Sequence, residues 1–225
     1  MSFNVAIDGP AGAGKSTAAR TAAELAGFIY VDTGAMYRAI GLYFLENEVD
    51  IHDEEACCEK LPDIQVTIIH KDDVQHILLN GEDVSERIRT QEVGEAASVT
   101  SAYPEVRAKL LDLQRDLAKA YDVIMDGRDI GTTILPDADL KIFLTASADV
   151  RAMRRVSELE KKGIEADFET VRQEILDRDE RDMNREISPL RQAEDAVVLD
   201  SSYLNIEETA EEVLRLIRER QCHGD

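Results

Sequence analysis

The chain has 225 residues, of which 44% are hydrophobic and 32% are charged, and its formal net charge is −21. This length can bury one large core, and no stretch approaches the ~20 apolar residues of a membrane span, so we expect a globular protein. The strong negative charge argues against nucleic acid and anionic membranes as partners, because both require a basic surface.

The first elements surround a glycine-rich loop. A short apolar strand is predicted at residues 3–7, and the alanine-rich helix after the loop ends at Gly27, a residue typical of helix C-termini. Residues 28–31 form a second predicted strand, and residues 35–46 form a helix. The order strand, glycine loop, helix and strand is typical of a nucleotide-binding α/β protein.

The next segment has a different pattern. Residues 64–70 and 74–79 alternate in polarity and are separated by turn residues at 71–73, and Asn80-Gly81 is a strong hairpin signal. We therefore predict a small antiparallel meander. Such a meander does not belong inside a series of parallel strands, so residues 38–104 are interpreted as an insert.

The α/β pattern then resumes. Pro104 suits the first turn of a helix that continues to residue 120. Ser147 and Asp167 precede two more predicted helices, and Asn205 with Glu208 resembles a capping box that begins the last helix. Further strands are predicted at residues 123–125, 140–144 and 196–199.

These elements predict an α/β fold with a parallel sheet, interrupted twice. The core is expected to comprise residues 1–37, 105–150 and 190–225. The insert at 38–104 contributes helices and a small antiparallel sheet, and residues 151–189 form a short, helical, arginine-rich lid.

The glycine-rich loop carries the clearest functional signal. It matches the pattern G-x-x-x-x-G-K-[ST], directly after a strand and before a helix, as a phosphate-binding loop requires, and this loop is shared by GTPase switches, ATPase motors and small-molecule kinases. Its backbone N–H groups and the helix N-terminus cradle phosphates, and the lysine reaches the outer phosphates. The predicted ATP-binding residues of this loop are Gly9, Pro10, Ala11, Gly12, Ala13, Gly14, Lys15, Ser16 and Thr17.

Two residues are candidates for holding Mg²⁺. The hydroxyl group of Ser16 is expected to bind the metal ion directly. Asp126 ends an apolar strand, where a second acidic group of such enzymes holds Mg²⁺ through water. Alternatively, Asp126 is only the aspartate of a turn before Gly127.

The arginines favour a small-molecule kinase over the other proteins with such a loop, GTPase switches and ATPase motors. Eight of the 18 arginines lie between residues 151 and 191, although the chain as a whole is acidic. Helical spacing places Arg151, Arg154 and Arg155 on one face, and Arg178, Arg181 and Arg185 on another; Arg172 and Arg191 complete the set. Such a hairpin can close over ATP, neutralise charge on the transferring group and exclude water. The alternative is a solvated helix pair with salt bridges.

The remaining motifs carry a family resemblance. The segments DGPAGAGKST, VDTGAMYR, GEDVSERIRTQEV, DGRDIGT, KIFLTAS and RDERDMNREISPL occur in this order. Together they resemble bacterial cytidylate kinases over residues 3–215. The resemblance implies transfer of a phosphoryl group from ATP, with Mg²⁺, to CMP or dCMP in pyrimidine metabolism, and a three-stranded sheet in the monophosphate-binding insert.

The resemblance also implies roles for individual residues. The cytosine base is read by Ser98, Arg107 and Asp129; the acceptor phosphate is held by Tyr37, Arg38, Arg128 and Arg185, and the ribose by Arg178 and Asp182. Thr33 stands where some relatives have serine, and its hydroxyl group is expected to contact CMP. The expected catalytic residues are Lys15, Arg128, Arg154, Arg181 and Arg185, and Arg154 and Arg155 are also expected to bind ATP.

Several alternatives remain at this point. Ser98 could serve only close helix packing, and Arg107 could face solvent. The chain could be a kinase for UMP, AMP or GMP, a shikimate-type kinase, or a non-catalytic ATP-binding regulator. A GTPase lacks support because no N-K-x-D motif is present, and a protein kinase lacks support because no H-R-D or D-F-G block is present.

The cysteines and the N-terminus bear on location. Cys57, Cys58 and Cys222 are an odd set without metal-binding spacing, which predicts neither a disulfide framework nor a zinc site. The N-terminus has neither the basic lead nor the apolar segment of a secretory signal. We therefore expect a cytoplasmic protein, and we expect it to be a monomer.

Overall fold

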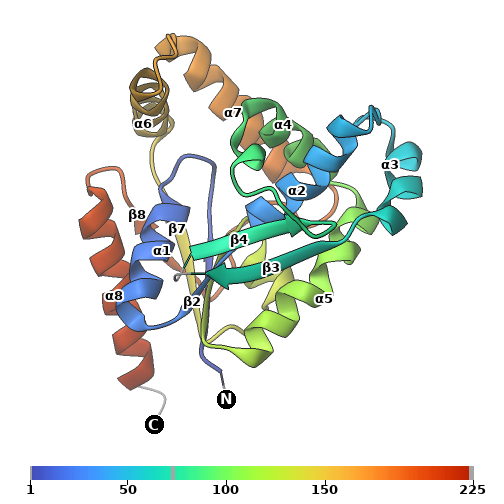
Figure 1. Cartoon of the computed structure of the whole chain (residues 1–225). Coiled ribbons are helices and arrows are strands. Elements are labelled where there is room, and N and C mark those ends of the chain that lie inside the picture. The colour runs from blue at the N-terminus through green and yellow to red at the C-terminus, as the bar shows by residue number, and fades with distance from the viewer. Residues whose placement is uncertain (1, 72–73, 223–225) are drawn as a thin grey trace. The chain divides into compact units, whose positions relative to one another are not determined.

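The computed structural model describes residues 2–71 and 74–222 and divides the chain into two compact units (Figure 1). The first unit comprises residues 1–30 and 121–225, and the second comprises residues 31–120. The turn predicted at 71–73 falls partly on residues 72 and 73, which lie outside the described part of the chain.

A five-stranded sheet organises the first unit. Its order is β2-β6-β1-β7-β8, and β1 pairs in parallel with β6 and β7, as β7 does with β8. Parallel strands end at the same edge, so the loops after β1 and β6 emerge together. The predicted α/β fold class is confirmed, with strands β1 (Asn4–Asp8), β2 (Ile29–Asp32), β6 (Val123–Gly127), β7 (Leu140–Thr145) and β8 (Val197–Asp200).

The described residues of this unit also form four α-helices and one π-helical turn. Helices α1 and α8 lie side by side (Figure 1), because the alanines of α1, such as Ala18 and Ala22, allow close packing against Val213 and Ile217 of α8. Helices α6 and α7 pack against each other as a hairpin. The elements are α1 (Lys15–Ala26), the π-turn η3 (Ile130–Ile134), α6 (Ala148–Lys161), α7 (Phe168–Asn184) and α8 (Ile206–Cys222).

The predicted helix starts have a direct structural basis. The side chains of Ser147 and Asp167 accept the N–H groups three residues ahead, at 3.3 and 2.8 Å. Asn205 and Glu208 exchange side chain-to-backbone hydrogen bonds of 2.8 and 2.9 Å, which is a complete capping box. These local bonds satisfy N–H groups that a helix leaves without partners.

The second unit combines helices with a three-stranded antiparallel sheet, as predicted. Asn80 and Gly81 have φ values of 50° and 87°, the left-handed geometry of a two-residue hairpin between β4 and β5. Helix α3 was not predicted. The elements are α2 (Thr33–Glu46), α3 (Glu54–Lys60), η1 (Leu61–Asp63), β3 (Val66–Lys71), β4 (Val74–Leu79), β5 (Glu82–Asp83), η2 (Arg87–Arg89), α4 (Gln91–Thr100) and α5 (Pro104–Ala120).

Within the described ranges, we find no helix that combines the length and apolar character needed to cross a membrane.

The backbone at Gly9 generates the first prediction. Its φ is 149°, and a Cβ there would lie 1.9 Å from the carbonyl oxygen of Leu144. Substitution Gly9→Ala should therefore lower the free energy of unfolding by at least about 3 kcal/mol, measured by urea denaturation. Gly163→Ala is the control: its φ of 74° is also positive, but no atom lies within 4 Å of the new Cβ, and it should cost about 1 kcal/mol. Equal losses would contradict the steric explanation.

Candidate functional site

The phosphate loop connects β1 to α1, and its lysine folds back over it. Lys15 donates a hydrogen bond of 2.8 Å from Nζ to the carbonyl oxygen of Pro10, and its side chain is only 5% exposed. Gly9, Gly12 and Gly14 have positive φ values, as a loop with inward-facing N–H groups requires. The loop therefore has the geometry that the sequence motif predicts.

The charge of Lys15 is strongly affected by its surroundings. Burial, followed by the guanidinium group of Arg128, lowers the pKa of Lys15 from 10.5 to about 7, against the opposing effect of three carboxylates, Asp126, Asp8 and Asp182. Near neutral pH this lysine thus sits close to its own titration point. A phosphate group placed on it would favour the charged form.

Asp126 is held by hydrogen bonds to both carboxylate oxygens. Ser16 donates to Oδ2 at 2.8 Å, and the buried Tyr30 donates to Oδ1 at 2.9 Å. A hydroxyl group next to a carboxylate is a suitable oxygen donor set for Mg²⁺, which binds through one or two protein groups together with substrate phosphates. No cluster of three or more metal-ligating side chains occurs in the described residues.

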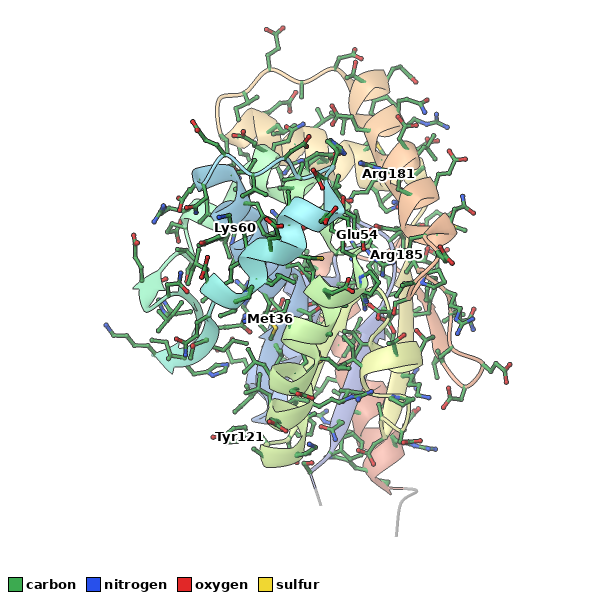
Figure 2. The ribbon with its side chains drawn as sticks, turned by 90° about the vertical axis from the view of Figure 1, so that its right-hand side faces the viewer. Met36, Glu54, Lys60, Tyr121, Arg181 and Arg185 are labelled. Atoms are coloured by element: carbon green, nitrogen blue, oxygen red, sulfur yellow. The ribbon has the colours of Figure 1, made fainter. Side chains whose placement is uncertain are left out.

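The loop after β6 meets the end of α7 through charged pairs. Arg128 donates from Nε to Oδ2 of Asp182 at 2.8 Å, and Arg185 lies 3.6 Å from Oδ1 of Asp129. Burial would raise the pKa of Asp182, but Arg128, Arg178 and Arg185 outweigh burial and hold the pKa below its ordinary value. Figure 2 shows Arg181 on α7 and Arg185 just past its end. Sequence-predicted residues are thus brought together here.

Two arginines of α6 bind backbone groups near the phosphate loop. Arg151, 5% exposed, donates to the carbonyl oxygens of Ala146 (2.9 Å) and Ala11 (3.0 Å) and to the Asp179 carboxylate (2.6 Å). Arg154 donates to the carbonyl oxygens of Ser201 at 2.6 Å and Leu204 at 3.2 Å. A bond of Arg154 to the phosphate-loop carbonyl of Ala13 is longer, at 3.4 Å. The face predicted from helical spacing therefore contacts the phosphate loop itself.

Two further arginines of the hairpin make ion pairs. Arg155 pairs with Glu158 at 3.4 Å within α6, and Arg172 of α7 pairs with Asp149 of α6 at 2.5 Å. These exposed pairs are the salt bridges that the alternative reading of the segment described. Part of the arginine set thus joins the two helices, and Arg151 does so as well through Asp179.

In the second unit, the first turns of α2 carry three predicted site residues: Thr33, Tyr37 and Arg38. The side chain of Asp32 caps this helix by accepting the N–H of Ala35 at 2.9 Å, so α2 begins at Thr33, two residues earlier than predicted. Arg38 donates to the carbonyl oxygen of Ile88 at 3.3 Å. A Cβ on Gly94 would lie 3.2 Å from the Arg38 guanidinium group, so glycine provides the space for it.

The remaining predicted residues of this unit come from α4 and α5. Arg107 is 8% exposed, lies 5.6 Å from the ring centre of Tyr37 and donates to the carbonyl oxygen of Ser101 at 3.2 Å. The interpretation that Arg107 faces solvent is therefore wrong. Among the described residues, the buried hydroxyl oxygen of Ser98 meets no hydrogen-bond partner, which a packing role leaves unexplained.

Comparison with known proteins decides the family. The family model described as "Cytidylate kinase" matches residues 5–219. The chain belongs to the cytidylate kinase family. Proteins named cytidylate kinase from Caldicellulosiruptor bescii and Bacillus subtilis are 53% and 46% identical over 216 and 218 residues; the alignments cover 95% and 97% of this chain and the same shares of those proteins.

A solved structure supports the fold alone. An uncharacterized protein from Eubacterium ventriosum has a TM-score of 0.54 at 13% identity, with 96% of this chain and 98% of that one covered. The resemblance to cytidylate kinases that the sequence motifs indicated is confirmed by the family match.

The structure also adds contacts that sequence reasoning missed. Tyr30 orients Asp126, and Arg151 joins the phosphate loop to α7. The hydroxyl oxygen of Ser201 lies within hydrogen-bond distance of the carbonyl oxygens of Ala13 (3.0 Å) and Thr145 (3.1 Å), one of which accepts its single proton. A tyrosine within a largely apolar strand was the only local signal for the first of these. The hydrogen bonds of Ser201 join segments far apart in the chain, so no local pattern could have indicated them.

The depressed pKa of Lys15 predicts proton uptake on nucleotide binding. At pH 8 most of the free protein should carry neutral Lys15, and ATP phosphates should restore its charge, so binding should take up about one proton. Calorimetric titration in two buffers of different ionisation enthalpy measures this number. In Lys15→Arg the guanidinium group stays charged, so the uptake should disappear. Wild-type heats that do not depend on the buffer would contradict the prediction.

Arg154 and Arg181 should differ in what they contribute. Arg154→Ala leaves carbonyl groups without their donor and should lower the free energy of unfolding by about 2 kcal/mol as well as kcat. Arg181 is exposed, so Arg181→Ala should change stability by less than about 0.5 kcal/mol while lowering kcat more than it raises KM. Thermal unfolding and steady-state kinetics on both variants check this. Arg181→Ala with unchanged kcat would assign that residue to surface salt bridges.

Proposed function

We propose that this chain transfers the γ-phosphoryl group of ATP to CMP or dCMP, giving ADP and CDP or dCDP. Membership of the cytidylate kinase family makes it an ATP-dependent phosphotransferase. The observation that carries the proposal is the buried Lys15 folded over the phosphate loop, together with the 2.8 Å ion pair between Arg128 of the DGRD loop and Asp182 of α7, whose charges also act on the pKa of Lys15. Donor-side and acceptor-side groups of the predicted site thereby act on one another within a single unit.

On the donor side, each proposed role follows from the chemistry of the residue. The backbone of residues 9–17 would hold the ATP phosphates, and Lys15 would neutralise charge on the transferring group. Ser16 would bind Mg²⁺, and Asp126 would hold it through water. The ion supplies charge neutralisation and alignment of the phosphates when bound. Arg154, Arg155 and Arg181 would act on ATP and the transferring group, with α6 and α7 as a lid.

On the acceptor side, the proposed contacts divide by chemical group. Cationic and hydroxyl groups suit the phosphate, and we assign Tyr37, Arg38, Arg128 and Arg185 to it, with Arg178 and Asp182 on the ribose and Thr33 as a further contact. Cytosine presents an amino donor beside acceptors, which a carboxylate, a cationic donor and a hydroxyl complement. We assign Asp129, Arg107 and Ser98 to the base. The Ser98 hydroxyl oxygen has no hydrogen-bond partner in the described part of the chain, which supports this assignment.

We further infer that the enzyme works as a monomer in the cytoplasm, as part of pyrimidine metabolism. The three cysteines are free thiols, which supports a reducing compartment. Burial, first among the causes, raises the pKa of Cys57 to about 11, so this thiol is unreactive at neutral pH.

A panel assay tests the proposed function. ADP release is measured with ATP, Mg²⁺ and each of CMP, dCMP, UMP, AMP and GMP. CMP and dCMP should give the highest kcat/KM, and a clear preference for UMP or AMP would replace the proposed acceptor. ATP binding without turnover of any monophosphate would instead indicate a regulator.

Asp129→Asn should change which base is preferred. UMP presents a carbonyl oxygen where CMP presents an amino group, so UMP opposite a carboxylate leaves two acceptors facing each other, at a cost of ~1–3 kcal/mol. An asparagine amide can donate there. The ratio of kcat/KM for CMP over UMP should therefore be high in the wild type and fall by about tenfold or more in the variant. A high ratio that Asp129→Asn leaves unchanged would move base reading to Arg107 and Ser98.

A further inference from the structure

Asp8 is a buried carboxylate to which the proposed mechanism assigns no contact with a substrate. It is the last residue of β1, directly before Gly9 of the phosphate loop, and its side chain is 4% exposed. Burial raises its pKa to about 6, against the effect of two backbone hydrogen bonds, so at neutral pH most of the protein carries it as a carboxylate. Burying a charge opposes folding unless hydrogen bonds compensate for the lost hydration, so the partners of this carboxylate indicate why it is kept here.

Both oxygens of Asp8 accept backbone N–H groups from the loop after β6. Ile130 donates to Oδ1 at 2.7 Å and Gly131 donates to Oδ2 at 2.8 Å. These residues begin the π-turn η3, and the first N–H groups of a helical turn have no acceptor inside the turn. Asp129, which precedes them, makes no side-chain capping bond of its own. Asp8 therefore caps η3 across 122 residues of sequence.

The fit at this contact is close. A Cβ on Gly131 would lie 3.1 Å from Cδ of Lys141 and 3.4 Å from Oδ2 of Asp8. The carbonyl oxygen of Asp129 accepts the N–H of Thr133 at 2.9 Å, so the backbone of Asp129 is set by the same turn. The residues that follow Asp129 thus contact β1 through Asp8 and β7 through Lys141.

We propose that Asp8 is a positioning residue for the acceptor nucleotide: its carboxylate fixes the backbone of residues 129–131, and thereby aims Asp129, in register with the start of the phosphate loop. The inference rests on the proposed function, in which Asp129 reads the acceptor base. A carboxylate is needed because two N–H donors require two acceptor oxygens. An asparagine offers one oxygen and turns a donor toward the second N–H.

The test uses Asp8→Asn with Asp139→Asn as the matched control. Asp139 also accepts a backbone N–H from β1, from Asn4 at 2.7 Å, but at the other end of the strand. Two quantities are measured in the full-length protein: hydrogen exchange of the amides of residues 127–135, and kcat/KM for the monophosphate that the wild type prefers. ATP affinity is measured separately by titration.

For Asp8→Asn we expect at least tenfold faster exchange at residues 130 and 131. The kcat/KM for the preferred acceptor should fall by about 100-fold, since small misplacements of binding groups have effects of this size, while the Kd for ATP stays within about threefold. The preference for CMP over UMP should fall as well. Asp139→Asn should leave all of these values near the wild type.

Other outcomes overturn the proposal. Wild-type exchange at residues 130 and 131, or faster exchange with unchanged kcat/KM, would remove the positioning role. An equal loss of ATP affinity would make Asp8 a brace of the phosphate loop instead. If Asp8→Asn does not fold, Gly131→Ala, which presses on the same contact from the loop side, should give the same selective loss in milder form, and a normal kcat/KM there would overturn the proposal.

The wild-type panel separates the two claims. A wild type that prefers UMP or AMP refutes the proposed acceptor, and the Asp8 test then proceeds with that nucleotide. A wild type that transfers to no monophosphate refutes both claims.

Discussion

The burial of the Lys15 side chain is the physical constraint around which the charged residues near the phosphate loop are arranged. An isolated ammonium group loses its hydration on burial, and the penalty is large unless carboxylates compensate. Here burial and the guanidinium group of Arg128 lower the pKa of the lysine to about 7, and three carboxylates act in the opposite direction. The balance suits a residue that must meet highly charged phosphates, because ligand charge can then decide its protonation.

Each of those carboxylates is held in place by a partner of its own. Hydroxyl groups hold Asp126, backbone N–H groups hold Asp8, and a guanidinium group holds Asp182. Charges that are fixed before a substrate arrives need little reorganisation during the reaction, which is how electrostatic preorganisation lowers a barrier. In this unit the strand ends of a parallel sheet collect these groups, as open α/β sheets do.

The arginines of α6 and α7 serve two purposes in a chain of net charge −21. Some hold the hairpin together, as Arg172 does with Asp149, and some hold backbone groups near the phosphate loop, as Arg154 does. Exposed pairs of this kind contribute little stability individually. Arg151 differs because it is buried and binds both the carbonyl oxygen of Ala11 in the phosphate loop and Asp179 of α7. A displacement of α7 would therefore act directly on the backbone of the phosphate loop.

Sequence alone determined the family, the parallel α/β core, the antiparallel hairpin at Asn80-Gly81 and the phosphate loop. Those features follow from short contiguous sequence patterns, because hydrophobic periodicity, helix caps and turn residues act within a few positions of one another. Tertiary structure alone decided the hydrogen bond of Tyr30 to Asp126, the hydrogen bonds of Asp8 to the loop after β6, and the burial of Arg107. The partners in these contacts lie far apart in the chain: Tyr30 is 96 residues from Asp126, and Asp8 is 122 and 123 residues from its two donors. Helical spacing could place arginines on one face of α6, but only the packed structure determined which acceptors that face would meet.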